Sequence, residues 1–431
     1  MPEAAKNNKN QRRRFGMTHQ THTNGDIACT SSPGRSARPL IAAGITSASA
    51  QVSDDVVKIG ILTDMSGLYS DLSGKGSVVA AKMAIDDFGK TVLGKPIELV
   101  SADSQNKADV ASARAREWVD QQKVDALMDL VPTNVALAVM EVAQQKNKVA
   151  IVVGSASSTV TNEKCTATSA HWMYDTYSSS VGTGRALMKR GADSWYFLTA
   201  DYAFGKSLEK DVSDVVAAGG GKVLGSVRHP LNASDFSSFL LQAQTSKAKV
   251  IGLANAGGDT VNAVKQAGEF GIASKGQLVA PLLMFISDVH AIGLNYAQDM
   301  YLTEGFYWDA NNETRAWSRR FFEIQKKMPT MAQAGMYSAV THYLKAIKAA
   351  GTDETGAVMK KMRELPISDV VIPKGTLRAD GRVVHDMLLL QVKKPAESKA
   401  PWDYYKIVGT VPGNEAFRPL AQSTCPLVRQ Q

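Results

Sequence analysis

The chain has 431 residues, of which 44% are hydrophobic, and this is enough for two compact domains with their own cores. A formal net charge of +8 would suit nucleic acid or a membrane surface. However, residues 1–50 hold seven of the 49 basic residues and only two of the 41 acidic ones, which leaves +3 for the remainder. We therefore do not expect nucleic acid to be a partner.

The first 50 residues have the order of a secretory leader. A short apolar run at 39–45 is followed by Ala48-Ser49-Ala50, a small-x-small cleavage site. We expect export to the periplasm with cleavage after Ala50. The polar character of residues 1–34 indicates a start codon assigned too early, and Met17 is one candidate for a later start. No run approaches the roughly 18–20 apolar residues of a membrane span.

From Val56 to Trp308 the chain repeats a short apolar strand, a polar turn and an amphipathic helix. Strands joined by crossover helices build parallel sheets that are covered on both faces. Because the repeat falls into two similar series, we predict an α/β fold with two doubly wound parallel-sheet lobes. The strand-like runs begin near Val57, Ile97, Asp125, Val149, Ser194, Lys222, Val250, Gln277 and Met300.

After Trp308 the pattern changes. Two helices are predicted around Trp317–Phe322 and Tyr337–Leu344. The closing runs, Met387–Val392 and Tyr404–Val408, alternate or are apolar throughout, and they are typical of edge or antiparallel strands.

In parallel sheets, ligands bind beyond the carboxyl ends of the strands. Here those ends, at 63–67, 131–134, 154–158 and 200–205, carry hydroxyls, small residues and aromatics. No histidine stands beside them to activate a nucleophile, so we expect a binding site without catalytic residues. The seven histidines lack metal-ligand spacing, and no phosphate-loop frame is present, so we expect neither a metal site nor a cofactor.

Three cysteines are present, and removal of the leader would leave Cys165 and Cys425. An even number in an oxidising compartment allows a disulfide that pins the C-terminal tail to the body. Two unpaired buried thiols are the other interpretation, and the sequence leaves both open.

Several motifs, in this order and spacing, resemble those of the type I periplasmic solute-binding proteins of ABC importers, in the branch of leucine/isoleucine/valine receptors. Val57–Ile61 with Asp64–Gly67 resembles the opening strand and first binding loop, Ala200–Gly205 the D-Y-x-aromatic-G turn, and Phe306–Asp309 a stretch near the hinge. The resemblance covers about Val56 to the C-terminus. It implies two lobes joined by a multi-strand hinge, with an ABC permease and a small carboxylate as partners, and we expect a monomer.

The resemblance also implies domain boundaries. We expect residues 1–50 to be the leader, 54–174 with 306–385 to form the N-terminal lobe, and 175–305 with 386–431 to form the C-terminal lobe.

Ligand contacts carried over from the family fall on the strand ends. Backbone N–H groups and hydroxyls would hold the ligand carboxylate, since a helix N-terminus presents unpaired donors and a positive dipole end. Helix capping alone also explains Thr133 and Asn134, and core packing also explains Met284 and Trp308. The expected ligand-binding residues are Tyr69, Thr133, Asn134, Ala156, Ser158, Phe204, Met284 and Trp308.

One departure from the family concerns charge. Amino-acid receptors commonly place a second-lobe acid against the ligand's ammonium, whereas Pro281–Phe285, the corresponding region, has none. A buried ammonium without a partner is costly, so aromatic or hydrophobic acids are the predicted ligands. Branched-chain amino acids are the alternative, with Asp259 or Asp288 as the acid, and a ligand-sensing domain is the alternative of another class.

Overall fold

The structure is a computed structural model that describes residues 52–429. The predicted leader, the Ala50 cleavage site and the alternative start at Met17 therefore lie outside the described residues. Within the described range, no helix is long and apolar enough to cross a bilayer.

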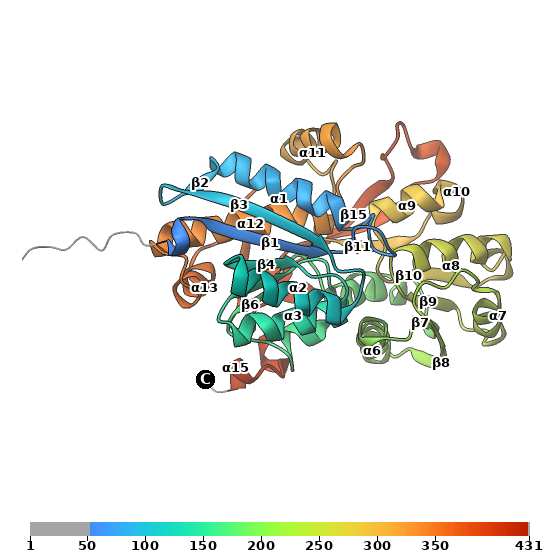
Figure 1. The fold of residues 1–431 in the computed structure, drawn as a ribbon. Helices are drawn as coiled ribbons and strands as arrows, with labels where there is room; N and C mark the ends of the chain where they lie inside the picture. Colours follow the sequence, from blue (N-terminus) through green and yellow to red (C-terminus); the bar gives the residue numbers. More distant parts are fainter. Residues whose placement is uncertain (1–51, 430–431) are drawn as a thin grey trace, which may run out of the picture. The chain divides into compact units, whose positions relative to one another are not determined.

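The first lobe is a six-stranded sheet with helices on both faces (Figure 1). The strand order is β2-β3-β1-β4-β5-β6, and every pair except β2–β3 is parallel. The strand β1 is buried on both faces from Ile59 to Thr63, and at Gly60 an added Cβ would stand 2.6 Å from the Trp118 ring, so the helix α2 packs directly on the strand. The elements are β1 (Val57–Thr63), α1 (Gly74–Phe88), β2 (Thr91–Val92), β3 (Lys95–Asp103), α2 (Ala108–Gln121), β4 (Ala126–Asp129), α3 (Thr133–Gln145), β5 (Val149–Val152) and β6 (Ser169–His171).

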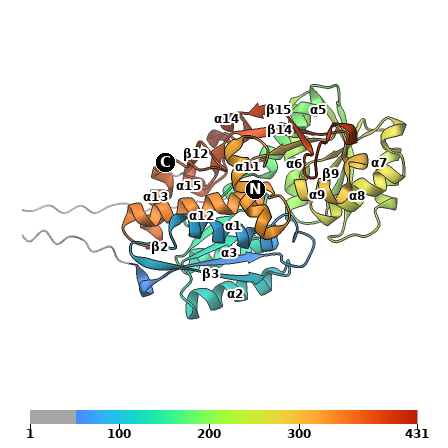
Figure 2. The same cartoon turned by 90° about the horizontal axis from the view of Figure 1, so that it is seen from above.

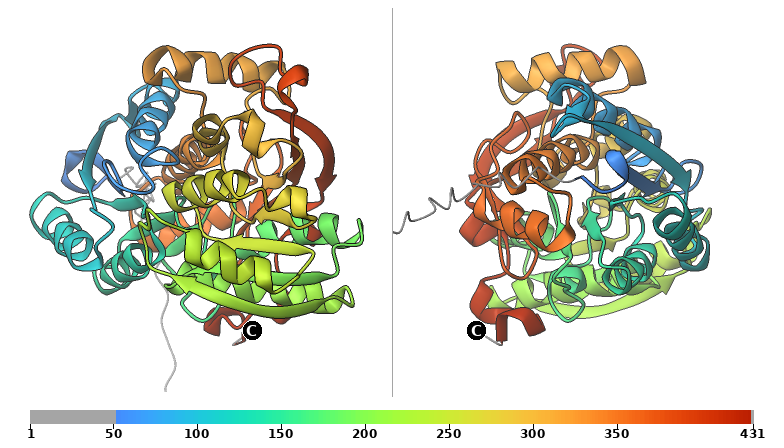
Figure 3. Two further views of the ribbon diagram at one scale, coloured as in Figure 1. Left: turned by 90° about the vertical axis from the view of Figure 1, so that its right-hand side faces the viewer. Right: turned by 60° about the vertical axis from the view of Figure 1, so that its left-hand side comes forward.

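The second lobe is a four-stranded, wholly parallel sheet in the order β10-β9-β7-β8. Its elements, green to yellow, group together in both views of Figure 3. The glycines at 219–221 follow directly after α6, as the sequence predicts. The elements are β7 (Ser194–Ala200), α6 (Ala203–Ala218), β8 (Lys222–His229), α7 (Ser237–Thr245), β9 (Val250–Ala254), α8 (Gly258–Glu269), β10 (Leu278–Pro281), α9 (Ile286–Ile292) and α10 (Leu294–Ala297).

The ninth strand-like run does not extend the parallel series. Instead β11 (Tyr301–Glu304) pairs antiparallel with β14 (Met387–Val392). The strand β14 in turn pairs antiparallel with β15 (Tyr405–Val411), and these two lie side by side in Figure 2. The physical reason is that β14 supplies an apolar partner from far along the chain: Leu302 lies opposite Leu390, and both are buried in the second-lobe core. The closing strands are thus antiparallel, as predicted.

Between β11 and β14 the chain returns to the first lobe. The helices α11 (Asn312–Gln325) and α12 (Met331–Ala350) pack on α1, and α12 lies beside α1 in Figure 2. Thr330 caps α12 by accepting the Gln333 N–H, and its hydroxyl donates to the Leu72 carbonyl in the loop before α1. The helix α13 (Thr355–Glu364) and the β12–β13 hairpin (Gly375–Leu377, Val383–His385) follow. The domain boundaries given above stay a prediction.

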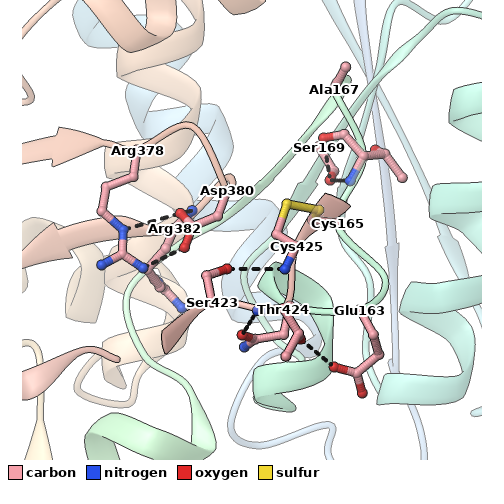
Figure 4. The surroundings of a disulfide bond; sticks show 12 residues. Glu163, Cys165, Ala167, Ser169, Arg378, Asp380, Arg382, Ser423, Thr424 and Cys425 are labelled. Carbon is pink, nitrogen blue, oxygen red and sulfur yellow. Dashed lines mark hydrogen bonds and ion pairs between the residues drawn. A yellow bond between two sulfur atoms is a disulfide. The ribbon is translucent and has the colours of Figure 1, made fainter. Parts of the chain in front are cut away.

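A disulfide joins Cys165, in the loop before β6, to Cys425 in the C-terminal tail (Figure 4). The pairing that the sequence left open is thus present, and it closes a loop of 260 residues. The tail also reaches the second lobe, because the Arg418 guanidinium donates to the Asp211 carboxylate on α6 at 2.7 Å. The tail therefore ties both lobes together at the side where the chain crosses between them.

We predict that the double substitution C165A/C425A lowers the free energy of unfolding by about 2–5 kcal/mol, because closing so long a loop restricts the unfolded chain. Urea denaturation of both proteins measures the loss. Reducing the wild-type protein should reproduce it and should leave the variant unchanged. Equal stability of the two oxidised proteins would contradict the prediction.

Candidate functional site

A cavity lies where the two parallel sheets direct their carboxyl ends toward each other. In the first sheet, β3 and β4 lie on opposite sides of β1, and in the second sheet β8 and β9 lie on opposite sides of β7. The loops diverge at these switch points and leave a crevice, which is where doubly wound sheets bind ligands. Its free volume is about 20 Å³, enough for about one water molecule, so the walls lie close together in this structure. The lining residues are Tyr69, Leu72, Val131, Pro132, Thr133, Gly154, Ser155, Ala156, Tyr174, Tyr202, Phe204, Ala256, Leu283 and Phe285.

Among these lining residues none has a charged side chain. The side-chain polar groups are hydroxyls, and two of them join the turns of the first lobe, since Thr133 Oγ1 lies 2.9 Å from Ser155 Oγ. Both side chains are buried, so the hydroxyls orient each other and the ends of the turns.

Backbone N–H groups without partners meet at the same wall. The helix α3 begins at Thr133 after Pro132, with no side chain capping it. Within residues 52–429, no acceptor meets the N–H groups of Thr133, Asn134 and Val135, nor those of Ser155 and Ala156. Unpaired donors at the positive end of a helix favour an anion. This wall therefore has the chemistry of a carboxylate clamp.

Aromatic rings form the rest of the cavity. The hydroxyls of Tyr69, from the first lobe, and Tyr202, from the second, lie 2.7 Å apart, so the two lobes meet in a hydrogen bond. Burial raises the pKa of both phenols above the usual value, so both rings stay neutral. Tyr174 and Phe285 meet edge to face with centroids 5.6 Å apart, and Phe204 packs on Tyr202 at 5.7 Å. Such walls suit a flat apolar body.

The turn that carries Ser155 and Ala156 is held from behind. The Nε2 atom of His171 lies 2.7 Å from the Ser155 carbonyl, and the Tyr174 hydroxyl donates to the Gly154 carbonyl at 3.1 Å. Burial lowers the pKa of His171 well below its usual value, so the ring is neutral and donates from Nε2. These bonds use the carbonyls of Gly154 and Ser155. The N–H groups of Ser155 and Ala156 have no acceptor within the described residues.

Four of the eight predicted ligand residues line this cavity: Tyr69, Thr133, Ala156 and Phe204. The other four do not. Asn134 is exposed and donates to the Asn106 carbonyl, because the second position of α3 turns outward. The Ser158 hydroxyl donates to Asp211 at 2.9 Å, so it joins the lobes outside the cavity.

Met284 and Trp308 also lie away from the cavity. Leu283 and Phe285 line the cavity, whereas Met284 packs into the second-lobe core. The Trp308 indole donates to the Trp402 carbonyl at 2.9 Å and packs beside both cores.

The list of expected ligand residues omits several lining residues, notably Tyr174, Tyr202, Ser155 and Leu283, although Ser155 and Tyr202 lie in strand ends that the sequence singled out. Tyr202 lies within the same strand-end turn as Phe204, so its position was a usable signal. Tyr174 follows β6, and this strand of only three residues has no apolar run to reveal it.

The two acids considered as partners for an ammonium lie outside the cavity lining. Asp259 accepts the N–H groups of Asn232 and Ala233 at 3.2 and 3.0 Å, and Asp288 accepts the Phe285 N–H at 2.9 Å. Burial raises the pKa of Asp259 to about 6 and that of Asp288 to about 7. Both carboxylates thus accept hydrogen bonds from backbone N–H groups outside the cavity.

Known proteins resemble this chain over most of its length. A family model described as periplasmic binding protein matches residues 56–399. A Leu/Ile/Val-binding protein homolog of Brucella melitensis is 25% identical, with 83% of this chain and 92% of that protein covered.

Solved structures of binding proteins also match this chain over most of its length. A periplasmic binding protein from Burkholderia mallei is 55% identical, covers 86% of this chain and 99% of its own, and has a TM-score of 0.85. A branched chain amino acid ABC transporter periplasmic ligand-binding protein from Burkholderia xenovorans is 40% identical, with 86% and 100% covered and a TM-score of 0.79. A solute-binding protein of an ABC transporter from R. palustris, in complex with benzoate, shares the fold at 19% identity, with 86% and 100% covered and a TM-score of 0.76. The chain belongs to the periplasmic binding protein family, with the type I fold of two parallel-sheet lobes.

Proposed function

We propose that this protein is the extracytoplasmic substrate-binding component of an ABC importer, and that it binds a small aromatic or hydrophobic carboxylate between its lobes. It acts in the periplasm as a monomer, without catalysis, and delivers its ligand to a membrane permease. The observation that carries this proposal is the cavity itself, which sets unpaired N–H groups and hydroxyls against aromatic walls with no charged side chain in the lining.

Binding would proceed by closure of the lobes around the ligand. Two contacts across the cleft support closure: the Tyr69–Tyr202 hydroxyl pair, and the Gly258 N–H, which donates to the Leu68 carbonyl at 3.2 Å. A ligand that contacts both lobes favours the closed state by its differential affinity for it, and the permease then recognises that state.

A branched-chain amino acid is the second candidate, and the Burkholderia xenovorans relative, named as a ligand-binding protein for branched chain amino acids, favours it. An amino acid brings an ammonium that needs an acceptor. Asp259 and Asp288 are engaged by backbone donors outside the lining, so hydroxyls and backbone carbonyls would have to serve. We therefore rank carboxylates without an ammonium group ahead of branched-chain amino acids as ligands. The benzoate complex of the R. palustris protein supports this ranking, because a protein of the same fold binds an aromatic acid there.

We predict that benzoate and hydroxybenzoates raise the melting temperature of the purified protein, whereas leucine, isoleucine and valine do so less or not at all. Ligand binding to the folded state alone stabilises it by mass action. Thermal melting across both panels, followed by calorimetric titration of each hit, measures the effect. Benzamide serves as the control, since it keeps the ring and lacks the charge. A response confined to α-amino acids would overturn the ligand assignment.

We predict that F204A weakens binding of the best carboxylate by about 10- to 100-fold, since it removes a buried ring from the ligand wall. The matched control is N134A, which alters a neighbouring strand-end residue that is exposed and off the lining. Its dissociation constant should stay within about twofold of wild type. Equal losses in both variants would show that the ligand lies elsewhere in the cleft.

A further inference from the structure

Behind the clamp lies an acid that the site described so far does not use. Asp129, the last residue of β4, has 0% of its surface exposed. Its Oδ2 atom accepts the Ser73 hydroxyl at 2.6 Å, whereas Oδ1 has no partner within the described residues. A buried carboxylate oxygen without a donor is costly, and native structures rarely keep one without a role.

The backbone of Asp129 builds the clamp. Its carbonyl accepts the N–H groups of Val153 and Gly154 at 3.0 and 2.9 Å, so it fixes the start of the turn that carries Ser155 and Ala156. Its own backbone is left-handed, with a φ of 77°, and the chain continues through Val131 and Pro132 directly into α3. One residue thus sets the position of both turns that present the unpaired N–H groups.

The carboxylate is also close to the cavity. A Cβ built on Gly154 would stand 2.8 Å from Asp129 Oδ1 and 1.9 Å from a Val131 methyl, and Gly154 and Val131 both line the cavity. Only the thickness of these two residues therefore separates the carboxylate from the ligand space. A charge at this depth is little screened by salt or water.

The groups that meet Asp129 are hydroxyls: Ser73 directly before α1, Ser77 in α1 and Thr63 at the end of β1. Within residues 52–429, no lysine, arginine or histidine forms an ion pair with it. Tyr174, on the segment after β6, is neutral, because burial and then the charge of Asp129 raise the pKa of its phenol. His171, behind the turn, is also neutral because burial lowers its pKa.

We propose that Asp129 is a positioning residue whose protonation is coupled to ligand binding, so that the site accepts a carboxylate anion together with one proton. The proton comes from solvent. Once on Oδ2 it is donated to Ser73 Oγ, and Ser73 in turn donates to Ser77 Oγ at 3.0 Å, so the hydroxyl hydrogens turn and the hydrogen-bond chain reverses while the heavy atoms stay in place. Neutral Asp129 removes the repulsion that an ionised carboxylate would exert on the bound anion. The proposal rests on the proposed function.

The sign of the effect follows from linkage. Burial raises the pKa of Asp129 to about 6 in the protein without ligand, and a bound anion raises it further. Between the two values, binding takes up a proton, so affinity rises as pH falls. A shift of about one unit on binding makes affinity about sevenfold higher at about pH 5.5 than at about pH 8.

The test is calorimetric titration of the full-length mature protein with benzoate over that pH range, in buffers of different ionisation enthalpy, which report proton uptake. D129N keeps the size and an acceptor for Ser73, and asparagine tolerates the left-handed backbone. We expect the pH dependence and the proton uptake to disappear in D129N. The control is D259N, which removes another buried acid with a pKa of about 6 outside the cavity lining. This variant should retain both the pH dependence of binding and the proton uptake.

Benzoate binding with the same affinity across the range, or an unchanged slope in folded D129N, would overturn the coupling while leaving the proposed function intact. If no carboxylate binds at any pH, the proposed function fails and the coupling fails with it. A melting curve of each variant verifies folding before titration.

Discussion

The first residues of an α-helix have backbone N–H groups that the helix cannot satisfy, and in this protein those of α3 start at Thr133, which lines the cavity between the lobes. No side chain caps them, and no charged side chain lines the space that they face. The rest of the site depends on this arrangement. Hydroxyls orient the turns, neutral phenols close the walls, and Asp129 and His171 hold the clamp from behind. An anion in this cavity would meet donors that are already in place.

Besides the chain crossings, the lobes are joined by several hydrogen bonds and, through the C-terminal tail, by one disulfide. Tyr69 and Tyr202 meet at the cavity, while Asp211 on α6 gathers Ser158, Thr176 and Arg418 at the crossing side. The C-terminal tail that carries Arg418 is anchored by the Cys165–Cys425 disulfide. Hydrogen bonds of this kind each contribute about 1 kcal/mol, so a ligand can shift the balance between open and closed states. The disulfide limits how far the tail can move.

Much of the architecture could be predicted because strand and helix periods are local. All nine predicted runs are strands, and the glycines after α6 end that helix where expected. β11 left the parallel series because its partner, β14, lies about 85 residues further along the chain, and pairing at that distance leaves no local pattern. The three-residue strand β6 was missed for the opposite reason: it is too short to have a period.

The sequence by itself determined the fold class, the family resemblance and the strand ends that line the cavity, because hydrophobic period and turn chemistry act between near neighbours. Only the tertiary structure decided which side chains at those ends face inward. It selected Phe285 over Met284, turned Asn134 outward and engaged Ser158 with Asp211. It also placed Asp129, inconspicuous at the end of a buried strand, behind the clamp. The physical reason is that side-chain direction and burial depend on where a second lobe packs, and the residues that form it lie far away along the chain.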